Sequence, residues 1–240
     1  MRAKEFIFNE GQHVDEGWKE LAATGILGLG LANPNNIQPS TPTTSTATAT
    51  TVSQNQANQV ANSKSTKHAA ALLHNPNAKV LNKAAKAAGL KGKELAQFLA
   101  QCAHETQNFK SLKEIGKKPD FKKYDVKHNP RLAKILGNTH AGDGYKYIGR
   151  GYIQLTGRDN YKRAGDALNL PLEKYPHLAE KPEVAAKVAV WFWKNRVVPR
   201  VASFDNTAQV TKPINSGMAG LEDRHNKYIG FNNLIKSKAI

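Results

Sequence analysis

The sequence predicts a mainly α-helical domain with a small β element, preceded by a disordered tether. Residues 33–66 are dominated by Thr, Ser, Asn and Gln and contain no aromatic residue, which is typical of a segment that cannot bury a core. Apolar residues recur at helical spacing over 95–103 and 182–196. Residues 142–161, between these helices, are rich in Gly, Tyr and basic residues. Their short alternating runs indicate a small hairpin or ordered loops.

The composition allows one substantial core and limits the chemistry. With 240 residues and 40% hydrophobic content, the chain can form a core domain of about 150 to 175 residues plus an appendage. The single cysteine, Cys102, rules out an internal disulfide. No CxxC or HExxH motif is present and the eight histidines are scattered, so we expect no metal site and no cofactor. We expect a monomer.

The positive charge is confined to the second part of the chain. Residues 1–66 contain four Lys or Arg and five Asp or Glu, whereas residues 67–240 contain 31 and 14. Such a surface attracts nucleic acid, anionic membrane or anionic cell wall. The basic residues are dispersed and no RNA- or DNA-binding motif accompanies them, so nucleic-acid binding is not expected.

Three segments follow from these shifts in composition: residues 1–32, a flexible linker over 33–66 and a globular domain over 67–240. Within the first, Asp15 could open a short helix, and residues 21–32 are apolar or glycine apart from Thr24. Twelve residues are too few to span a bilayer, which needs about 20. We interpret residues 1–32 as a docking helix or packaging tag. A signal-peptide core is the alternative, although the preceding charges are mixed.

The helices of the domain are predicted from apolar stripes. One stripe ends at Glu105 and consists of Leu95, Phe98, Leu99, Cys102 and Ala103. A second helix begins at Pro182, a favourable first-turn residue, and is apolar on most faces, which indicates a central buried position for Trp191, Phe192 and Trp193. A third helix is expected to open near Gly220.

Two glutamates nine residues apart, Glu105 and Glu114, are candidates for acid–base chemistry. Glycosidic cleavage needs one carboxylic acid and one carboxylate on either side of the bond. In an unbroken helix, nine residues would rise about 13.5 Å and turn about 900°, which places the two side chains on opposite faces. The polar pair Gln107 and Asn108 could end the helix and let the chain fold back. The hypothesis requires such a break.

The surroundings of the two glutamates suit different roles. Glu105 ends a buried helix, where desolvation favours the neutral acid. Glu114 lies among lysines, which favour the ionised form expected of a base. A glutamate near a helix end is at least as often a solvated or salt-bridged residue. If Glu114 is not the base, Asp120 and Asp125 are the nearest substitutes.

Four ordered motifs resemble glycoside hydrolase family 19, the chitinase-like enzymes. HETQNFKSLKE resembles the family's HETxxF…E segment, with the glutamate spacing of the phage and bacterial endolysin branch. YKYIGRGYIQLTGRDNY, KPEVAAKVAVWFWK and VTKPINSGMAGLEDR resemble three further family segments. The resemblance covers about residues 67–240. It implies a lysozyme-like α+β fold, with Glu105 as general acid, Glu114 as general base and Thr156 as the hydroxyl that holds the attacking water.

The resemblance also implies a substrate-binding set, which consists of Gln154, Asn160, Asn215, Arg224 and His104. Amides suit sugar hydroxyl and N-acetyl groups because each offers donors and an acceptor. Arg224 would lie near the acid, and His104 is expected to be a structural hydrogen-bonding residue. Tyr152 replaces a family proline and could add an aromatic surface that stacks on a sugar.

The expected function is that of an endolysin-like muramidase that cleaves the β-1,4 bonds of bacterial peptidoglycan by inversion. It would be phage-encoded and act on the host cell wall in the periplasm, free or virion-bound, with residues 1–32 held in a virion or at a membrane. Two alternatives stay open: a chitinase acting on N-acetylglucosamine polymers, and a catalytically silent wall-binding module.

Overall fold

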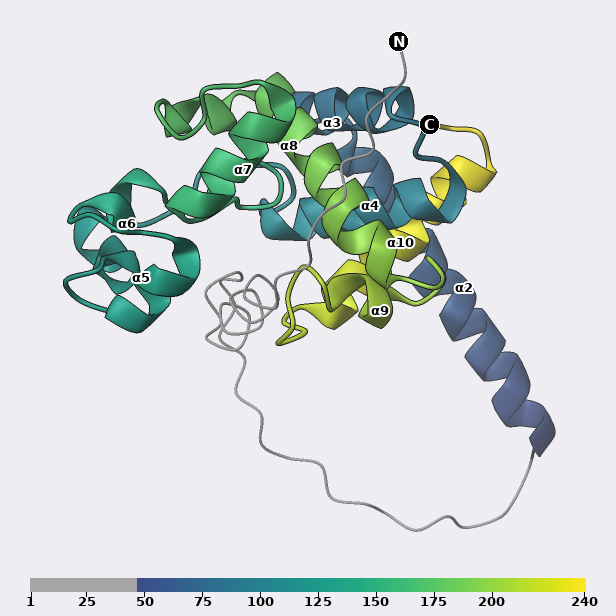
Figure 1. Ribbon diagram of the computed structural model, residues 1–240. Helices are drawn as coiled ribbons and strands as arrows, with labels where there is room; N and C mark the ends of the chain where they lie inside the picture. The colour runs from purple at the N-terminus through teal and green to yellow at the C-terminus, as the bar shows by residue number, and fades with distance from the viewer. Residues whose placement is uncertain (1–46) are drawn as a thin grey trace.

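A computed structural model describes residues 47–240, with side chains from residue 57 onwards. The described chain is mainly helical, as predicted (Figure 1). Its elements are α2 (Ala47–Leu72), α3 (Pro76–Ala87), α4 (Gly92–Glu105), η1 (Lys118–Tyr124), α5 (Pro130–Leu136), α6 (Asp143–Lys146), α7 (Arg158–Leu168), η2 (Pro176–Glu180), α8 (Pro182–Phe192), the π-helical turn η3 (Trp193–Val197), η4 (Val198–Arg200), α9 (Thr207–Thr211) and α10 (Leu221–Lys236). The predicted segment 1–32 and the linker residues 33–46 lie outside the described residues.

Helix α2 differs from the prediction of a flexible linker, because residues 47–66 are helical. The C-terminal part of α2 packs closely against α10. A Cβ atom at Gly230 would lie 2.2 Å from the carbonyl oxygen of Ser65, and Asn233 Nδ2 donates a hydrogen bond to Thr66 Oγ1 at 3.0 Å. Composition alone predicted a tether, whereas this packing and the absence of Gly and Pro over 47–66 support a helix.

The larger core lies among α3, α4, α8 and α10. The apolar stripe predicted on α4 is buried throughout, which confirms the helix and its inward face. The Phe98 and Trp193 rings pack edge to face with centroids 5.2 Å apart, and Trp193 Nε1 donates a hydrogen bond to Glu94 Oε1 at 3.1 Å. Phe192 is buried as predicted, whereas Trp191 is only partly buried.

A smaller lobe is formed by η1, α5 and α6 and stands apart from the larger core (Figure 1). Its own hydrophobic cluster consists of Phe121, Tyr124, Leu132, Leu136 and Ile148. The segment around Glu114 leads into this lobe, and residues 147–157 lead back to the larger core. Contacts between these two connecting segments therefore fix the lobes relative to each other.

The predicted β element is reduced to two isolated antiparallel bridges, Lys113 with Arg150 and Arg150 with Leu155, and no longer strand occurs within residues 47–240. Ordered loops therefore replace the hairpin that was one of two structures expected for residues 142–161. Gly151 and Gln154 have φ of 77° and 50°, so the chain curls back at once instead of extending into a ladder.

Candidate active site

Glu105 is the last residue of α4, and its side chain is buried against α10. The carboxylate is only 2% exposed, and its Oε1 accepts a hydrogen bond of 2.5 Å from Nη2 of Arg224, which is fully buried. Two further hydrogen bonds hold the guanidinium, from Nη1 to Gln101 Oε1 at 2.6 Å and from Nε to the Ala219 carbonyl oxygen at 3.0 Å. Arg224, which was expected to lie near Glu105, therefore forms a buried ion pair with it.

His104 faces away from this pair and has a structural partner. Its Nδ1 lies 2.6 Å from Asp223 Oδ2, and Asp223 also pairs with Lys227. The hydrogen bond with His104 is the largest cause of the lowered pKa of Asp223; burial opposes it and Lys227 adds to it. Gly220 fits beneath the ring because a Cβ there would lie 2.0 Å from His104. These contacts give His104 a structural hydrogen-bonding role.

The helix break that the hypothesis requires occurs directly after Glu105. Gln107, Asn108 and Phe109 all have left-handed backbone conformations, with φ of 50°, 65° and 64°. The left-handed conformation is unfavourable for residues other than glycine, so the surrounding contacts must stabilise the turn. Thr106 Oγ1 accepts a hydrogen bond from Phe109 N at 3.1 Å, and Asn77 Nδ2 donates one to the Phe109 carbonyl oxygen at 2.9 Å. Helix α4 therefore cannot continue toward Glu114.

Glu114 is fixed between the two lobes. Its Oε2 accepts a hydrogen bond from Gly149 N at 2.9 Å, and its Oε1 accepts one from the Tyr124 hydroxyl at 2.8 Å. Lys123 Nζ lies 3.8 Å from Oε1, and the carboxylate is 15% exposed. Burial, and then the Glu114 charge, raise the pKa of Tyr124 well above its usual range, so its hydroxyl remains a donor. Each oxygen of the Glu114 carboxylate therefore accepts one hydrogen bond from a fixed donor.

Thr156 and Gln154 lie beside Glu114, as the resemblance implied. A Cβ atom built on Gly149 would lie 3.2 Å from Glu114 Oε2, 2.9 Å from Gln154 Oε1 and 3.3 Å from Thr156 Oγ1. The oxygens of these three side chains therefore lie close together beside Gly149. The Thr156 hydroxyl donates a hydrogen bond to the Gln154 carbonyl oxygen at 2.8 Å, so its lone pairs are free to accept.

Asn160 and Asn215 differ in the hydrogen bonds that their side-chain amides make. Asn160 Nδ2 donates a hydrogen bond to the Thr156 carbonyl oxygen at 2.7 Å and thereby supports the loop that carries this residue. Asn215 is 1% exposed, and its Oδ1 accepts a hydrogen bond from Gly217 N at 3.1 Å. Its buried Nδ2 has no hydrogen-bond partner among the described residues, which leaves a donor available for a ligand.

The prediction that Tyr152 stacks on a sugar is wrong. Its side chain is fully buried, its ring packs against Phe109 with centroids 6.3 Å apart, and its hydroxyl donates a hydrogen bond to the Asn77 carbonyl oxygen at 2.7 Å. A ring enclosed in this way cannot stack on a sugar. The sequence shows an aromatic residue in a motif but not that the preceding Gly151, with φ of 77°, turns it into the core.

The sequence profile of glycoside hydrolase family 19, described as chitinase class I, matches residues 47–237. The chain belongs to this family. It is accordingly a glycoside hydrolase of the chitinase type. The profile also covers the helical residues 47–66 that composition had assigned to a linker.

Relatives of this family 19 chain come from bacteria and plants. A glycosyl hydrolase family 19 domain-containing protein of Haemophilus influenzae is 35% identical over 155 residues, which is 55% of this chain and 76% of that protein. An endochitinase of Arabidopsis thaliana is 33% identical over 58% of this chain and 47% of its own length. The crystal structure of chitinase C from Streptomyces griseus superposes with a TM-score of 0.55 at 26% identity, covering 71% of this chain and 91% of the other.

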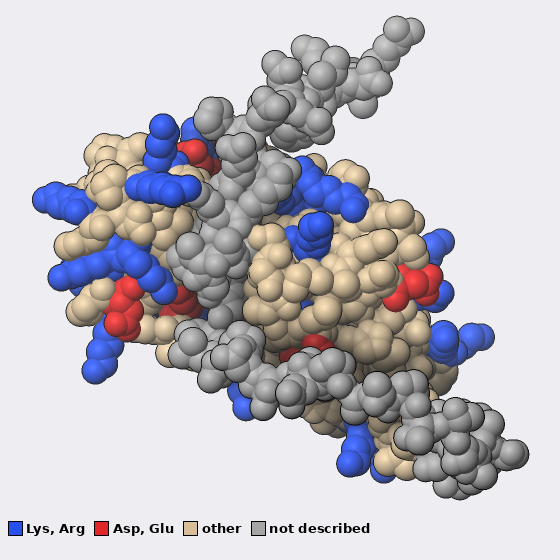
Figure 2. Space-filling model, turned by 90° about the horizontal axis from the view of Figure 1, so that it is seen from below, with Lys and Arg blue, Asp and Glu red and all other residues tan. Residues whose placement is uncertain are grey.

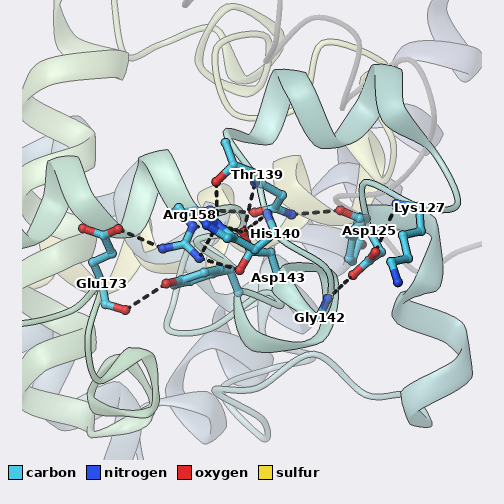
Figure 3. A network of polar contacts seen from close by, with 11 residues as sticks. Asp125, Lys127, Thr139, His140, Gly142, Asp143, Arg158 and Glu173 are labelled. Atoms are coloured by element: carbon cyan, nitrogen blue, oxygen red, sulfur yellow. Dashed lines mark hydrogen bonds and ion pairs between the residues drawn. The ribbon is translucent and has the colours of Figure 1, made fainter.

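The substitutes considered for the base have structural roles in this family 19 domain. Asp120 is exposed, and its Oδ2 accepts a hydrogen bond of 2.7 Å from Lys117 N at the start of η1. Asp125 is buried, and its oxygens accept hydrogen bonds from Gly142 N at 2.6 Å and Lys127 N at 3.2 Å (Figure 3). Burial opposes ionisation, but these backbone donors outweigh it and lower the pKa of Asp125. Both carboxylates are used in holding loops.

Three residues at the site were missed by sequence reasoning: Gln101, Tyr124 and Gly149. Gln101 precedes Glu105 by one helical turn, so its position on the same face of α4 could have been found from spacing. Tyr124 lies in a stretch without a recognisable motif, and only the folded lobe brings its hydroxyl to Glu114.

Two further features of the family 19 domain concern metal ions and membranes. Within the described range, no group of three or more His, Cys, Asp or Glu side chains is placed so that it could hold a metal ion. Over the same range, no helix combines the length and the apolar character that crossing a membrane requires.

Proposed function

We propose that this chain hydrolyses the β-1,4 glycosidic bonds of bacterial peptidoglycan as an inverting muramidase, with Glu105 as general acid and Glu114 as general base. The observation that carries the proposal is the separation of the two carboxylates by the left-handed turn at 107–109. Glu105 stays with the larger core through Arg224, and Glu114 is fastened to the smaller lobe through Tyr124. In an inverting pair, the two carboxyl groups lie about 6.5 to 9.5 Å apart to admit both sugar and water.

In this mechanism, Glu105 in its protonated form donates its proton to the leaving glycosidic oxygen as the bond to the anomeric carbon breaks. A water molecule held by Glu114 and the Thr156 hydroxyl attacks that carbon from the opposite face and gives a proton to Glu114. The carboxylate left on Glu105 is stabilised by its ion pair with Arg224. The products are one chain with a free hydroxyl and one reducing end of inverted configuration.

The substrate preference follows from the positive charge of residues 110–127, the segment that carries the proposed base. It contains seven lysines, all of them exposed: Lys110, Lys113, Lys117, Lys118, Lys122, Lys123 and Lys127. Of its three acids, Glu114 is the proposed base, Asp120 caps η1 and Asp125 is buried. Figure 2 shows basic side chains outnumbering acidic ones on the smaller lobe. Peptidoglycan bears carboxylates on its peptide branches, whereas chitin is neutral, so this surface favours peptidoglycan.

A chitinase activity is the second candidate, because endochitinases and chitinase C are among the relatives. Mass analysis of digested peptidoglycan separates the two functions. Products with reducing N-acetylmuramic acid ends would support the muramidase, and cleavage of chitin oligomers alone would reject it. Replacing Lys117, Lys118 and Lys122 together by Gln should raise KM for peptidoglycan severalfold and leave chitin oligomers unaffected. The same triple change at Lys79, Lys83 and Lys86 of α3 is the matched control.

The catalytic role itself is tested separately from the substrate. Glu105→Gln and Glu114→Gln should each lower kcat by at least 100-fold while peptidoglycan binding in a pull-down assay is retained. If neither the wild type nor Glu105→Gln releases glycan fragments while both bind peptidoglycan equally, the protein acts as a silent wall-binding module instead.

The biological setting forms part of the same proposal. We assign the chain to the endolysin branch, where it would be phage-encoded and lyse the host wall from the periplasm, with residues 1–32 docking to a virion or membrane. Fusion of residues 1–32 to a fluorescent protein tests the docking role, since co-sedimentation with purified virions or with vesicles distinguishes the two supports and a fully soluble fusion rejects both.

A further inference from the structure

Helix α4 carries a row of polar side chains behind the proposed acid. Gln97, Gln101 and Glu105 follow one another at intervals of four residues and therefore share one face of the helix. Gln97 is fully buried and Gln101 is 2% exposed, which is unusual for glutamine and requires hydrogen-bond partners. Both face α9.

The two glutamines have similar threonine partners on α9. Gln97 Nε2 donates hydrogen bonds to Thr207 Oγ1 and to the Phe204 carbonyl oxygen, each at 3.1 Å. Gln101 Nε2 donates to Thr211 Oγ1 at 3.0 Å, and the Thr211 hydroxyl donates onward to the Thr207 carbonyl oxygen at 2.8 Å. Because its amide nitrogen is held by Thr211, the amide oxygen of Gln101 must point the other way.

That oxygen accepts the hydrogen bond from Arg224 Nη1 at 2.6 Å, and this contact distinguishes Gln101 from Gln97. We infer that Gln101 is a positioning residue that holds Arg224 in a single-contact ion pair with Glu105. Arg224 Nη1 donates its hydrogen bond to Gln101, and Nε donates to the Ala219 carbonyl oxygen. Only Nη2 therefore donates to the Glu105 carboxylate. The inference rests on the proposed role of Glu105 as general acid.

The single contact matters because an acid must regain its proton in each cycle. A bidentate Arg–carboxylate pair is stronger than a single hydrogen bond and favours the ionised carboxylate more. Without the Gln101 oxygen, the buried Nη1 would have to turn to Glu105 for an acceptor. The other titratable groups near Glu105 are His104, which is paired with Asp223, and the buried Cys102, and neither replaces that acceptor.

The variant Gln101→Met tests the inference, because methionine keeps the shape and removes both hydrogen bonds of the amide. We expect kcat on purified peptidoglycan, or on chitin hexamer if peptidoglycan is not cleaved, to fall about 10- to 100-fold with KM within about twofold. We expect the alkaline limb of the pH–rate profile to move to lower pH by roughly 0.5 to 1 unit. Gln101→Glu adds a second carboxylate near the pair, so its alkaline limb should move to higher pH.

Gln97→Met is the matched control. It removes two buried hydrogen bonds from the same helix face, so its loss of thermal stability should equal or exceed that of Gln101→Met. Its kcat should stay within about threefold and its pH profile should not move. Equal kcat losses and unmoved pH profiles in both variants would overturn the positioning role. The variant Glu105→Gln keeps the two hypotheses apart: if it is inactive while Gln101→Met behaves like Gln97→Met, only the inference about Gln101 fails.

Discussion

The guanidinium of Arg224 and the carboxylate of Glu105 form an ion pair of 2.5 Å in which the side chains are 0% and 2% exposed. A pair removed from water to this extent is costly to break on one side only, because the remaining charge has no solvent to compensate it. The fold and the proposed chemistry therefore depend on the same contact.

Replacing Arg224 by Met should destabilise the domain by about 3 to 5 kcal/mol at neutral pH, because the Glu105 carboxylate loses its buried partner. The double change Glu105→Gln with Arg224→Met should recover much of that loss without recovering activity. Urea unfolding of the wild type, the two single variants and the double variant gives the coupling energy. Additive losses of stability would show that the two side chains do not interact.

Gly149→Ala should remove activity with little effect on the fold. The added Cβ would lie 2.9 to 3.3 Å from the oxygens of Gln154, Glu114 and Thr156 and would displace the side chains that are proposed to hold the attacking water. We expect kcat to fall at least 100-fold and Tm to change by only a few degrees. Gly165→Ala is the opposite control, because its Cβ would lie 2.6 Å from the Leu170 carbonyl oxygen, and neither residue belongs to the proposed site. This variant should lower Tm, whereas kcat of the folded protein should be unchanged.

Gln107→Gly should stabilise the protein by about 0.5 to 1 kcal/mol, because Gln107 is exposed and has φ of 50°, a conformation that costs a side chain but not glycine. Chemical unfolding measures the gain. Lys110→Gly, which lies three residues further along outside the left-handed stretch, should instead lower stability through the entropy of the unfolded chain. A loss in both variants would mean that the turn is not strained.

Asp143 should make the stability of the protein depend on acidic pH. Burial alone would raise the pKa of Asp143, but Arg158, at 2.6 Å, and the backbone N–H groups of Thr139 and His140 lower it below 3.8 (Figure 3). Because the folded-state pKa lies below that of the unfolded chain, this stabilisation is complete above about pH 4 and is lost as pH falls through the folded value.

Asp143→Asn is therefore expected to lower the free energy of unfolding by about 2 to 3 kcal/mol at pH 7, with a smaller difference from wild type at pH 3. Urea unfolding at pH 7, 5 and 3 measures both proteins. Asp166→Asn, which breaks the exposed pair with Lys162, should have no measurable effect at any pH. A difference at Asp143 that is constant with pH would contradict the assignment.

The parts of the fold that local patterns specify were predictable from the sequence. The stripe on α4, the helix from Pro182 and the helix after Gly220 follow from spacing and end signals, and the structure confirms each. The break after Glu105 was inferred from what the chemistry required, and it occurs there.

The contacts that depend on distant segments could not be read from local patterns. The burial of Tyr152 depends on Asn77, which is 75 residues away, and Gln101 meets Arg224 across 123 residues. The packing of α2 on α10 supports the helical conformation of residues 47–66. Amino-acid composition does not indicate this contact. A single sequence reveals which side chains are available, whereas their partners follow from the tertiary fold.

Helix α2 has a mechanical consequence for anything joined to its N-terminal end. Residues 57–64 are all exposed, and close packing begins only near Ser65 (Figure 1). At 1.5 Å per residue, the helix places Ala47 roughly 28 Å from Thr66. A group attached directly at Ala47 would therefore lie at about this distance from the point where α2 meets α10.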